Sequence, residues 1–203
     1  MKYPENRKVL EALPIQIFGF IFYPPSPRFI GHEDMATLRK LTDTLKNKAG
    51  VFVDATFDHI CKITELAGLT YVQLHGNETP GFCRKVRNSG IRLIKAFRVD
   101  ESFDFTSILE YAETVDFFLF DTKAEKPGGT GQKFNWELLE NYKTETPFFL
   151  SGGIKPEDAE QIKKIEHPQF YGIDLNSGFE DKPGLKNFEQ LSSFLHRLNN
   201  PKL

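Results

Sequence analysis

Four side chains that can carry charge or move a proton follow directly after short apolar runs of the sequence. They are Arg28 in the loop YPPSPRFI, Asp54 after GVFV, His75 after VQL and Asp121 after DFFLF. A carboxyl group at such a place can act as a general acid, and an arginine can bind a carboxylate or phosphate through paired hydrogen bonds. The pattern leaves other roles open, because Asp121 could cap a turn, Arg28 could be solvated and His75 could be structural.

Two glycine-rich turns near the end of the sequence suggest a site for an anion. They are SGGIKPED at 151–158 and LNSGFE at 175–180, and each follows an apolar run. Small residues let backbone N–H groups approach a phosphate closely, and a helix that begins after the turn adds its dipole. Either turn alone could simply reverse the chain, but together they predict a phosphate cradle.

The apolar runs that carry these groups have the pattern of buried strands. They are four to eight residues long in their apolar part and are bounded by Gly, Asp or Pro, as in parallel sheets covered on both faces. The expected strands lie within 15–22, 50–54, 70–76, 91–97, 116–122, 147–153 and 170–178. Helices are expected at 4–12, 34–47, 57–67, from Pro156 onward and at 186–198.

Strand and helix alternate along the whole chain, which predicts βα units and a parallel sheet. Seven strands and about eight helices are expected, and a helix candidate at 4–12 precedes the first strand. An eightfold barrel begins with a strand and holds its functional groups at the carboxyl ends of its strands. The sequence therefore predicts an α/β fold, a TIM (β/α)8-type barrel that lacks its first strand, as a single domain over 1–203. An open doubly wound sheet is the alternative.

The composition excludes several classes of function. The chain has 203 residues with 26 Lys and Arg against 28 Asp and Glu, a net charge of −2, which argues against general nucleic-acid binding. Cys61 and Cys83 are too far apart for a CxxC metal site and too few for a disulfide scaffold. No apolar run reaches 18 residues, which argues against a membrane span, and the amino end lacks the apolar region of a secretory signal. The loop GGTG at 128–131 lacks the pattern of a nucleotide-binding loop. We expect a cytoplasmic protein.

Taken together, the strand ends and their loops resemble the phosphoribosylanthranilate isomerase family of tryptophan biosynthesis. The matching segments occur in the family's order and cover nearly the whole chain. They are GFIFYPPSPRFI (19–30), VFVD (51–54), VQLHGNETP (72–80), IKAFRV (94–99), LFDT (119–122), GGTGQKFNW (128–136), LSGGIKPED (150–158) and IDLNSGFEDKPGLKN (173–187).

The resemblance implies an Amadori rearrangement of N-(5′-phosphoribosyl)anthranilate to 1-(2-carboxyphenylamino)-1-deoxyribulose 5-phosphate, with no metal or redox cofactor. It assigns the general acid to Asp121 and the anthranilate carboxylate to Arg28, with His75 and Asp174 lining the pocket. It assigns the substrate phosphate to Gly152, Gly153, Asn176, Ser177 and Gly178. The family more often has SSG where this chain has Asn-Ser-Gly, a change that keeps hydrogen-bonding capacity.

One departure concerns the catalytic base. The family's base is a cysteine in a K-[IV]-C-G-M segment on the first barrel strand, before a stretch like KYPEN, and here Met1 directly precedes that stretch. We therefore expect the first strand and its cysteine to be missing, through a start codon assigned to an internal Met or through truncation. Cys61 and Cys83 fall in expected helices as packing residues, and Asp54 and His75 are the nearest alternative bases.

Three further expectations follow. A barrel without one strand should be less stable and should expose strand edges at 15–22 and 170–175, where a homodimer or another segment could pair. A chain without the base could instead be a non-catalytic barrel that binds a phosphorylated small molecule. The histidine-pathway isomerase is a weaker alternative, because its first-strand aspartate would be missing as well.

Overall fold

The structure is a computed structural model, and it describes residues 1–31, 45, 47–123 and 133–199. The expected helix at 34–47 and the GGTG loop at 128–131 lie almost wholly outside these described residues. No helix in the described ranges is long and apolar enough to cross a lipid bilayer.

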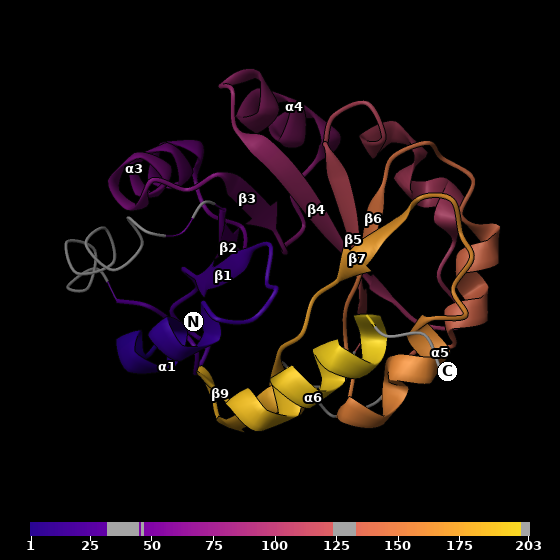
Figure 1. The fold of residues 1–203 in the computed structure, drawn as a ribbon. Helices are drawn as coiled ribbons and strands as arrows, with labels where there is room; N and C mark the ends of the chain where they lie inside the picture. The colour runs from indigo at the N-terminus through magenta and orange to yellow at the C-terminus, as the bar shows by residue number, and fades with distance from the viewer. Residues whose placement is uncertain (32–44, 46, 124–132, 200–203) are drawn as a thin grey trace.

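Seven parallel strands form one curled sheet in which spatial order follows chain order (Figure 1). All seven expected strands are confirmed. Five lie within the expected ranges, whereas the strand expected at 50–54 begins earlier, at Lys48, and the strand expected at 91–97 ends later, at Val99. The strands are β1 (Phe18–Ile21), β2 (Lys48–Phe52), β3 (Tyr71–Leu74), β4 (Arg92–Val99), β5 (Phe117–Thr122), β6 (Phe148–Leu150) and β7 (Phe170–Ile173). Because each strand pairs with the next in parallel register, all their carboxyl ends meet at one edge of the sheet.

Among the described connections, those after β2 and β3 are α-helices, and those after β4 and β5 contain 3₁₀ helices. The α-helices are α1 (Pro4–Leu10), α3 (Phe57–Ala67), α4 (Pro80–Asn88), α5 (Ala159–Ile162) and α6 (Phe188–Asn199). The 3₁₀ helices are η2 (Phe105–Tyr111), η3 (Trp136–Asn141), η4 (Pro156–Asp158) and η5 (Ser177–Phe179), and a hairpin of β8 (Glu180–Lys182) and β9 (Leu185–Lys186) precedes α6.

Local sequence explains where these helices begin and end. The helix α3 has the predicted bounds, because Thr56 accepts a hydrogen bond from the His59 backbone and Gly68 ends the helix in the left-handed conformation. A helix begins at Pro156 as expected and is short: a 3₁₀ turn leads into a four-residue α-helix. Few large apolar residues follow Ile162 to extend its buried face, and Pro168 cannot continue a helix.

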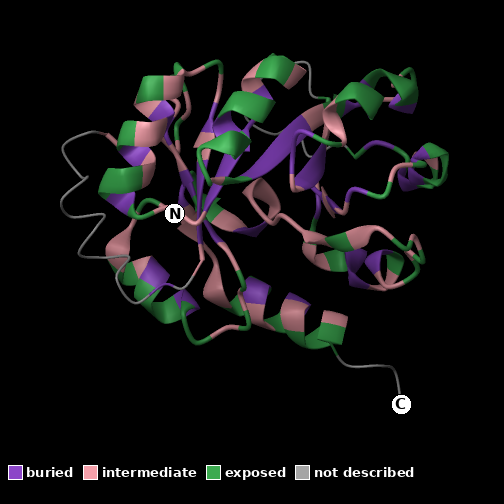
Figure 2. Ribbon diagram, turned by 90° about the horizontal axis from the view of Figure 1, so that it is seen from above, coloured by how far each residue is buried: buried purple, intermediate pink, exposed green. Residues whose placement is uncertain are grey.

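The core is rich in phenylalanine and lies mainly between the sheet and its covering helices. Figure 2 shows the buried residues concentrated along the strands, with exposed residues on the outer faces of the helices. Phe120 is fully buried, and its ring lies 5.2–5.3 Å from the rings of Phe105, Tyr142 and Phe148. A smaller cluster fills the concave side of the sheet and is built from Ala49, Tyr71, Ile94, Ala96, Phe117 and Leu119.

Replacing Phe120 by alanine tests how much this aromatic cluster contributes to the stability of the fold. We expect Phe120→Ala to lower the free energy of unfolding by about 3–5 kcal/mol, because it removes a fully buried ring and leaves a cavity. At about 2–4 °C per kcal/mol for a domain of this size, the melting temperature should fall by about 6–20 °C. A calorimetric melt measures this, and a shift below about 2 °C would show that the cluster contributes little.

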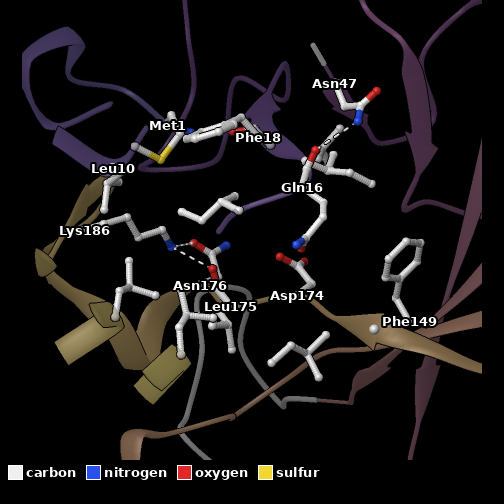
Figure 3. Close-up of a pocket in the computed structure, with 18 of the residues that line it drawn as sticks. Met1, Leu10, Gln16, Phe18, Asn47, Phe149, Asp174, Leu175, Asn176 and Lys186 are labelled. Carbon is white, nitrogen blue, oxygen red and sulfur yellow. Dashed lines mark hydrogen bonds between the residues drawn. The ribbon is translucent and has the colours of Figure 1, made fainter. Parts of the chain in front are cut away.

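The sheet does not close on itself within the described residues, because β1 pairs only with β2 and β7 only with β6. The expected fold is therefore confirmed as a barrel-type sheet of seven strands with a gap where an eighth would stand. A cavity of about 570 Å³ occupies the gap, bordered by Phe18 and Gly19 on one side and by Gly172 and Ile173 on the other. In the close-up of Figure 3, Met1 and Phe18 lie on one wall, facing Asp174, Asn176 and Lys186.

Candidate active site

The carboxyl edge of the sheet carries most of the predicted functional side chains. Asp121 lies in β5 near its end, His75 follows β3, Ser151 follows β6 and Asp174 follows β7. Arg28 lies in the loop after β1. This is the face on which barrel enzymes build their active sites.

A histidine and a carboxylate form the central pair of the site. His75 Nε2 lies 3.2 Å from Asp121 Oδ2, and both side chains are partly exposed. The Gln73 side-chain nitrogen lies 3.1 Å from His75 Nδ1. With the Gln73 amide donating to Nδ1, the ring proton is on Nε2, which donates to Asp121. This arrangement orients Asp121 through Oδ2, while Oδ1 lies beside Gly152.

A second carboxyl group stands beside this pair. Asp174 is close enough to Asp121 and His75 for their charges to act on it, and Ser151 Oγ lies 3.4 Å from its Oδ2. Burial raises the pKa of Asp174 and the Asp121 carboxylate raises it further, against the opposing effect of Lys186. The structure thus brings His75 and Asp121, which the strand ends predicted, together with Asp174, which the family resemblance implied.

A buried ion pair between Lys95 and Glu78 stabilises the turn that carries His75. Lys95 Nζ donates to Glu78 Oε2 at 3.0 Å and to the carbonyl oxygen of Gly76 at 2.8 Å. Glu78 in turn accepts hydrogen bonds from the backbone N–H groups of Gly76 and Asp54.

Asp54, one of the two alternative bases, is tied to the same turn. Its carboxylate accepts a hydrogen bond from the Asn77 backbone at 2.6 Å, and its own backbone has a φ of 48°. The left-handed region is rare for residues other than glycine. We attribute this conformation to the turn, which Asp54 helps to fix.

The two glycine-rich turns pack against each other, as a shared phosphate cradle requires. A Cβ on Gly178 would overlap the carbonyl oxygen of Ile154, so only glycine allows this approach. Gly152 and Gly153 both have positive φ, at 86° and 66°. Among the described residues, the backbone N–H groups of Gly152, Gly153, Ser177 and Gly178 have no hydrogen-bond acceptor. They are available to bind an anion.

Gly152 also links the cradle to Asp121. A Cβ at this position would lie 2.6 Å from Asp121 Oδ1 and would overlap the Thr122 backbone nitrogen. We expect Gly152→Ala to displace Asp121 and to lower any turnover by at least about tenfold, because a misplaced catalytic group loses rate steeply.

Gly90→Ala is the matched control for Gly152→Ala. Gly90 has a φ of 85°, and a Cβ there would meet nothing within 4 Å. It should cost about 1–2 kcal/mol of stability through backbone strain and leave turnover unchanged. Equal turnover losses in the two variants would mean that strain, rather than contact with Asp121, causes the effect.

Arg28 has a partner that the sequence analysis did not assign. Its Nε and Nη2 donate to the two carboxylate oxygens of Glu180, with the shortest distance 2.6 Å. Glu180 also pairs with Lys186 at 3.1 Å. The hydrogen bonds of Arg28 and the positive charges of Arg28 and Lys186 hold the pKa of the Glu180 carboxyl below its usual value, against the effect of burial. Glu180 and Lys186 both lie within 173–187, a segment that carries the family resemblance, but no local pattern there indicates a pairing with Arg28.

The two cysteines lie outside this site. Cys61 is on α3 and Cys83 on α4, and Cys83 is buried in the core. Burial raises the pKa of the Cys83 thiol to about 11, so it is not a reactive thiolate near neutral pH. The prediction that both are packing residues agrees with these positions.

The cavity in the sheet gap opens toward the site from one side. Arg28, Asp174, Asn176 and Lys186 are among its lining residues, whereas His75 and Asp121 are not. Figure 3 shows Lys186 bonded to Asn176 and Leu175 on the wall that carries β7. The predicted site residues therefore form two adjoining groups, one lining the gap and one around Asp121, and Asp174 belongs to both.

The sheet defines a βα-barrel protein in which His75, Asp121 and Asp174 lie together at the carboxyl edge, and Asp121 lies beside a glycine-rich turn. Residues 5–197 match the family model described as N-(5′-phosphoribosyl)anthranilate (PRA) isomerase. The chain therefore belongs to the N-(5′-phosphoribosyl)anthranilate isomerase family, an isomerase family, as the resemblance implied.

Relatives and solved structures agree with this assignment. The chain is 46% identical to the N-(5′-phosphoribosyl)anthranilate isomerase of Parabacteroides distasonis, over 99% of this chain and 91% of that one. It is 38% identical to that of Phocaeicola vulgatus, over 98% and 94%. The crystal structure of phosphoribosyl anthranilate isomerase from Thermotoga maritima superposes with a TM-score of 0.84 at 30% identity, over 98% and 95%. A further isomerase structure at 29% identity, with a TM-score of 0.82 over 98% and 94%, holds reduced 1-(o-carboxyphenylamino)-1-deoxyribulose 5-phosphate.

Proposed function

We propose that this chain carries the site for the Amadori rearrangement of N-(5′-phosphoribosyl)anthranilate in tryptophan biosynthesis. The observation that carries the proposal is the position of Asp121, bonded to His75 and placed directly beside the Gly152 cradle. This arrangement would hold the 5′-phosphate of the substrate on the backbone N–H groups and the ribose against the acid. Arg28, at the other end of the site, would take the anthranilate carboxylate.

The reaction then needs one proton donor and one proton acceptor. Asp121 would give its proton to the ribose ring oxygen while the bond from that oxygen to C1′ breaks, which opens the ring to a protonated Schiff base. A base would remove the proton from C2′, and the electron pair of that C–H bond would move to neutralise the Schiff base as an enamine. The enamine, which is also an enol, becomes the ketone product when carbon C1′ gains a proton and the hydroxyl group on C2′ releases its own proton to solvent.

The base is the incomplete part of this site, and it supports a second candidate function. Neither cysteine of the sequence reaches the carboxyl edge of the sheet. The family's thiolate would belong to a strand in the gap between β1 and β7. A barrel with the acid and the cradle but without the base would bind the phosphorylated ligand and turn it over slowly, if at all.

Loss of an isotopic label from ribose C2′ distinguishes these two functions. Substrate that carries deuterium at C2′ is incubated with the protein, and both product and label are followed by NMR. The proposed reaction predicts conversion to the ketone with the deuterium released to solvent. Binding of the substrate without release of the label, at any enzyme concentration, would favour the binding function.

The proposal also covers the oligomeric state of the protein and its place in the cell. A Thermotoga maritima relative is described as a dimeric enzyme from which monomers were generated, and we propose that this chain also forms a homodimer. We further propose that it works in the cytoplasm, together with the other enzymes of amino-acid biosynthesis. Sedimentation equilibrium and cell fractionation test these two points.

A further inference from the structure

We propose that Glu180 and Lys186 are positioning residues that set the two ends of the substrate site. Glu180 orients Arg28, and Lys186 orients the backbone that carries Asn176. The inference rests on the proposed function, because it takes Arg28 as the carboxylate end and Asn176 as part of the phosphate end.

Glu180 holds Arg28 by one edge of its guanidinium group. Arg28 Nε donates to Oε1 at 3.2 Å and Nη2 donates to Oε2 at 2.6 Å, and the Glu180 side chain is only 3% exposed. Two parallel hydrogen bonds fix the plane of a guanidinium group as well as its distance. Within the part of the chain that the structure describes, no other group bonds to the edge formed by Nη1 and Nη2, and this edge can bind a second carboxylate in fork geometry.

Lys186 connects this pair to the turn that follows β7. Its Nζ donates to Asn176 Oδ1 at 2.8 Å and to the carbonyl oxygen of Leu175 at 3.0 Å, as Figure 3 shows. The same nitrogen lies 3.1 Å from Glu180 Oε1. The carboxylate of Glu180 therefore joins the arginine to the turn of the phosphate cradle through a single buried lysine.

The hairpin β8–β9 supplies the rigid support for both residues. Gly184 makes its turn with a φ of 83° and donates its N–H to Glu180 Oε1 at 3.2 Å. The hairpin is fixed to α1, since Asn6 exchanges two hydrogen bonds with the backbone of Lys186. Hydrogen bonds from Gly184 and Asn6 thus fix Glu180 and Lys186, and a binding site of defined geometry needs such supporting contacts.

This arrangement predicts a specific loss of carboxylate recognition when Glu180 is neutralised. Glu180→Gln keeps the shape of the side chain but removes the charge that fixes Arg28. We expect it to weaken binding of reduced 1-(o-carboxyphenylamino)-1-deoxyribulose 5-phosphate by at least about tenfold, the effect of misaligning a charged hydrogen bond. Binding of the matching phenylamino compound without the carboxyl group should change by less than about threefold.

Titration calorimetry with both compounds measures the ratio of their two dissociation constants for each variant. Asp116→Asn is the control, because Asp116 belongs to an ion pair with Arg87 at the amino end of β5, away from the site. The parent and Asp116→Asn should prefer the carboxylated compound to the same degree. Glu180→Gln should lose most of that preference, whereas a general loss of folding would weaken the binding of both compounds to the same degree.

The outcomes separate this inference from the proposed function. A parent chain that prefers the carboxylated compound, with a Glu180→Gln variant that keeps the full preference, would overturn the positioning role alone. A parent chain that binds neither compound, or binds both equally, would overturn the proposed function and the inference with it.

Discussion

Replacing Asp121 by asparagine should lower kcat for phosphoribosylanthranilate by about 10²–10⁴-fold, which is the usual contribution of a general acid. Asparagine keeps the size of the side chain, and its amide oxygen can still accept the hydrogen bond that His75 donates at 3.2 Å. It cannot give a proton to the ribose ring oxygen, so ring opening would lose its acid. The loss should therefore appear in kcat and leave ligand affinity nearly unchanged.

Two measurements check this result in the same preparation. Single-turnover kinetics give the chemical rate, and calorimetry with the reduced product analogue gives the affinity, which should stay within about threefold of the parent. If Asp121→Asn retained more than about a tenth of the parent rate, Asp121 would not be the acid. Asp174, the neighbouring carboxyl group whose pKa burial raises, would then be the candidate.

Filling the gap between β1 and β7 should raise the melting temperature by about 4–16 °C. The gap is bordered by unpaired edges of two parallel strands and by apolar side chains, among them Leu10, Phe149 and Leu191. We expect the burial of apolar side chains there, together with backbone hydrogen bonds to both strand edges, to outweigh the conformational entropy that the added strand loses. A net gain of about 2–4 kcal/mol corresponds to that shift in melting temperature.

The position of Met1 suggests that a strand added before it would fill the gap. Its buried amino nitrogen donates to the carbonyl oxygen of Gly19 at 2.5 Å, and Asp174 at the end of β7 is near enough to act on it. Residues joined to Met1 would therefore enter the gap from its carboxyl edge and run parallel to both strands. We expect the extension Val-Val-Lys-Ile-Ser-Gly to stabilise the protein, whereas Val-Pro-Lys-Pro-Ser-Gly should not, because proline cannot donate to a ladder. Equal melting temperatures for the two extended proteins would show that the gap binds no strand.

The sequence was sufficient to predict the sheet and the edge at which the site lies. Buried parallel strands are apolar nearly throughout, and seven such runs correspond to β1–β7. The polar residues at their ends, such as His75 and Asp121, could then be assigned to one face, because parallel strands share their direction. The structure brings His75, Asp121 and Asp174 together as expected.

The partners of those residues could not be predicted, because they depend on side-chain packing between distant segments. Arg28 and Glu180 are 152 positions apart, and no local pattern indicates that they form a buried pair. The same holds for Lys95 and Glu78 under the His75 turn. The length of the helix after Pro156 could not be predicted either, since a helix ends where its buried face ends, and burial is a property of the fold.

Turnover of phosphoribosylanthranilate by three proteins tests the central claim, that this chain carries the acid and the cradle of the isomerase and needs a strand thiol as base. The proteins are the 203-residue chain, the chain extended by Val-Val-Lys-Ile-Cys-Gly before Met1, and the same extended chain with serine in place of the added cysteine. We predict that the cysteine-extended protein exceeds both others in kcat by at least about 10²-fold, the contribution of a general base. Three equal rates, or no turnover by the cysteine-extended protein, would contradict the account.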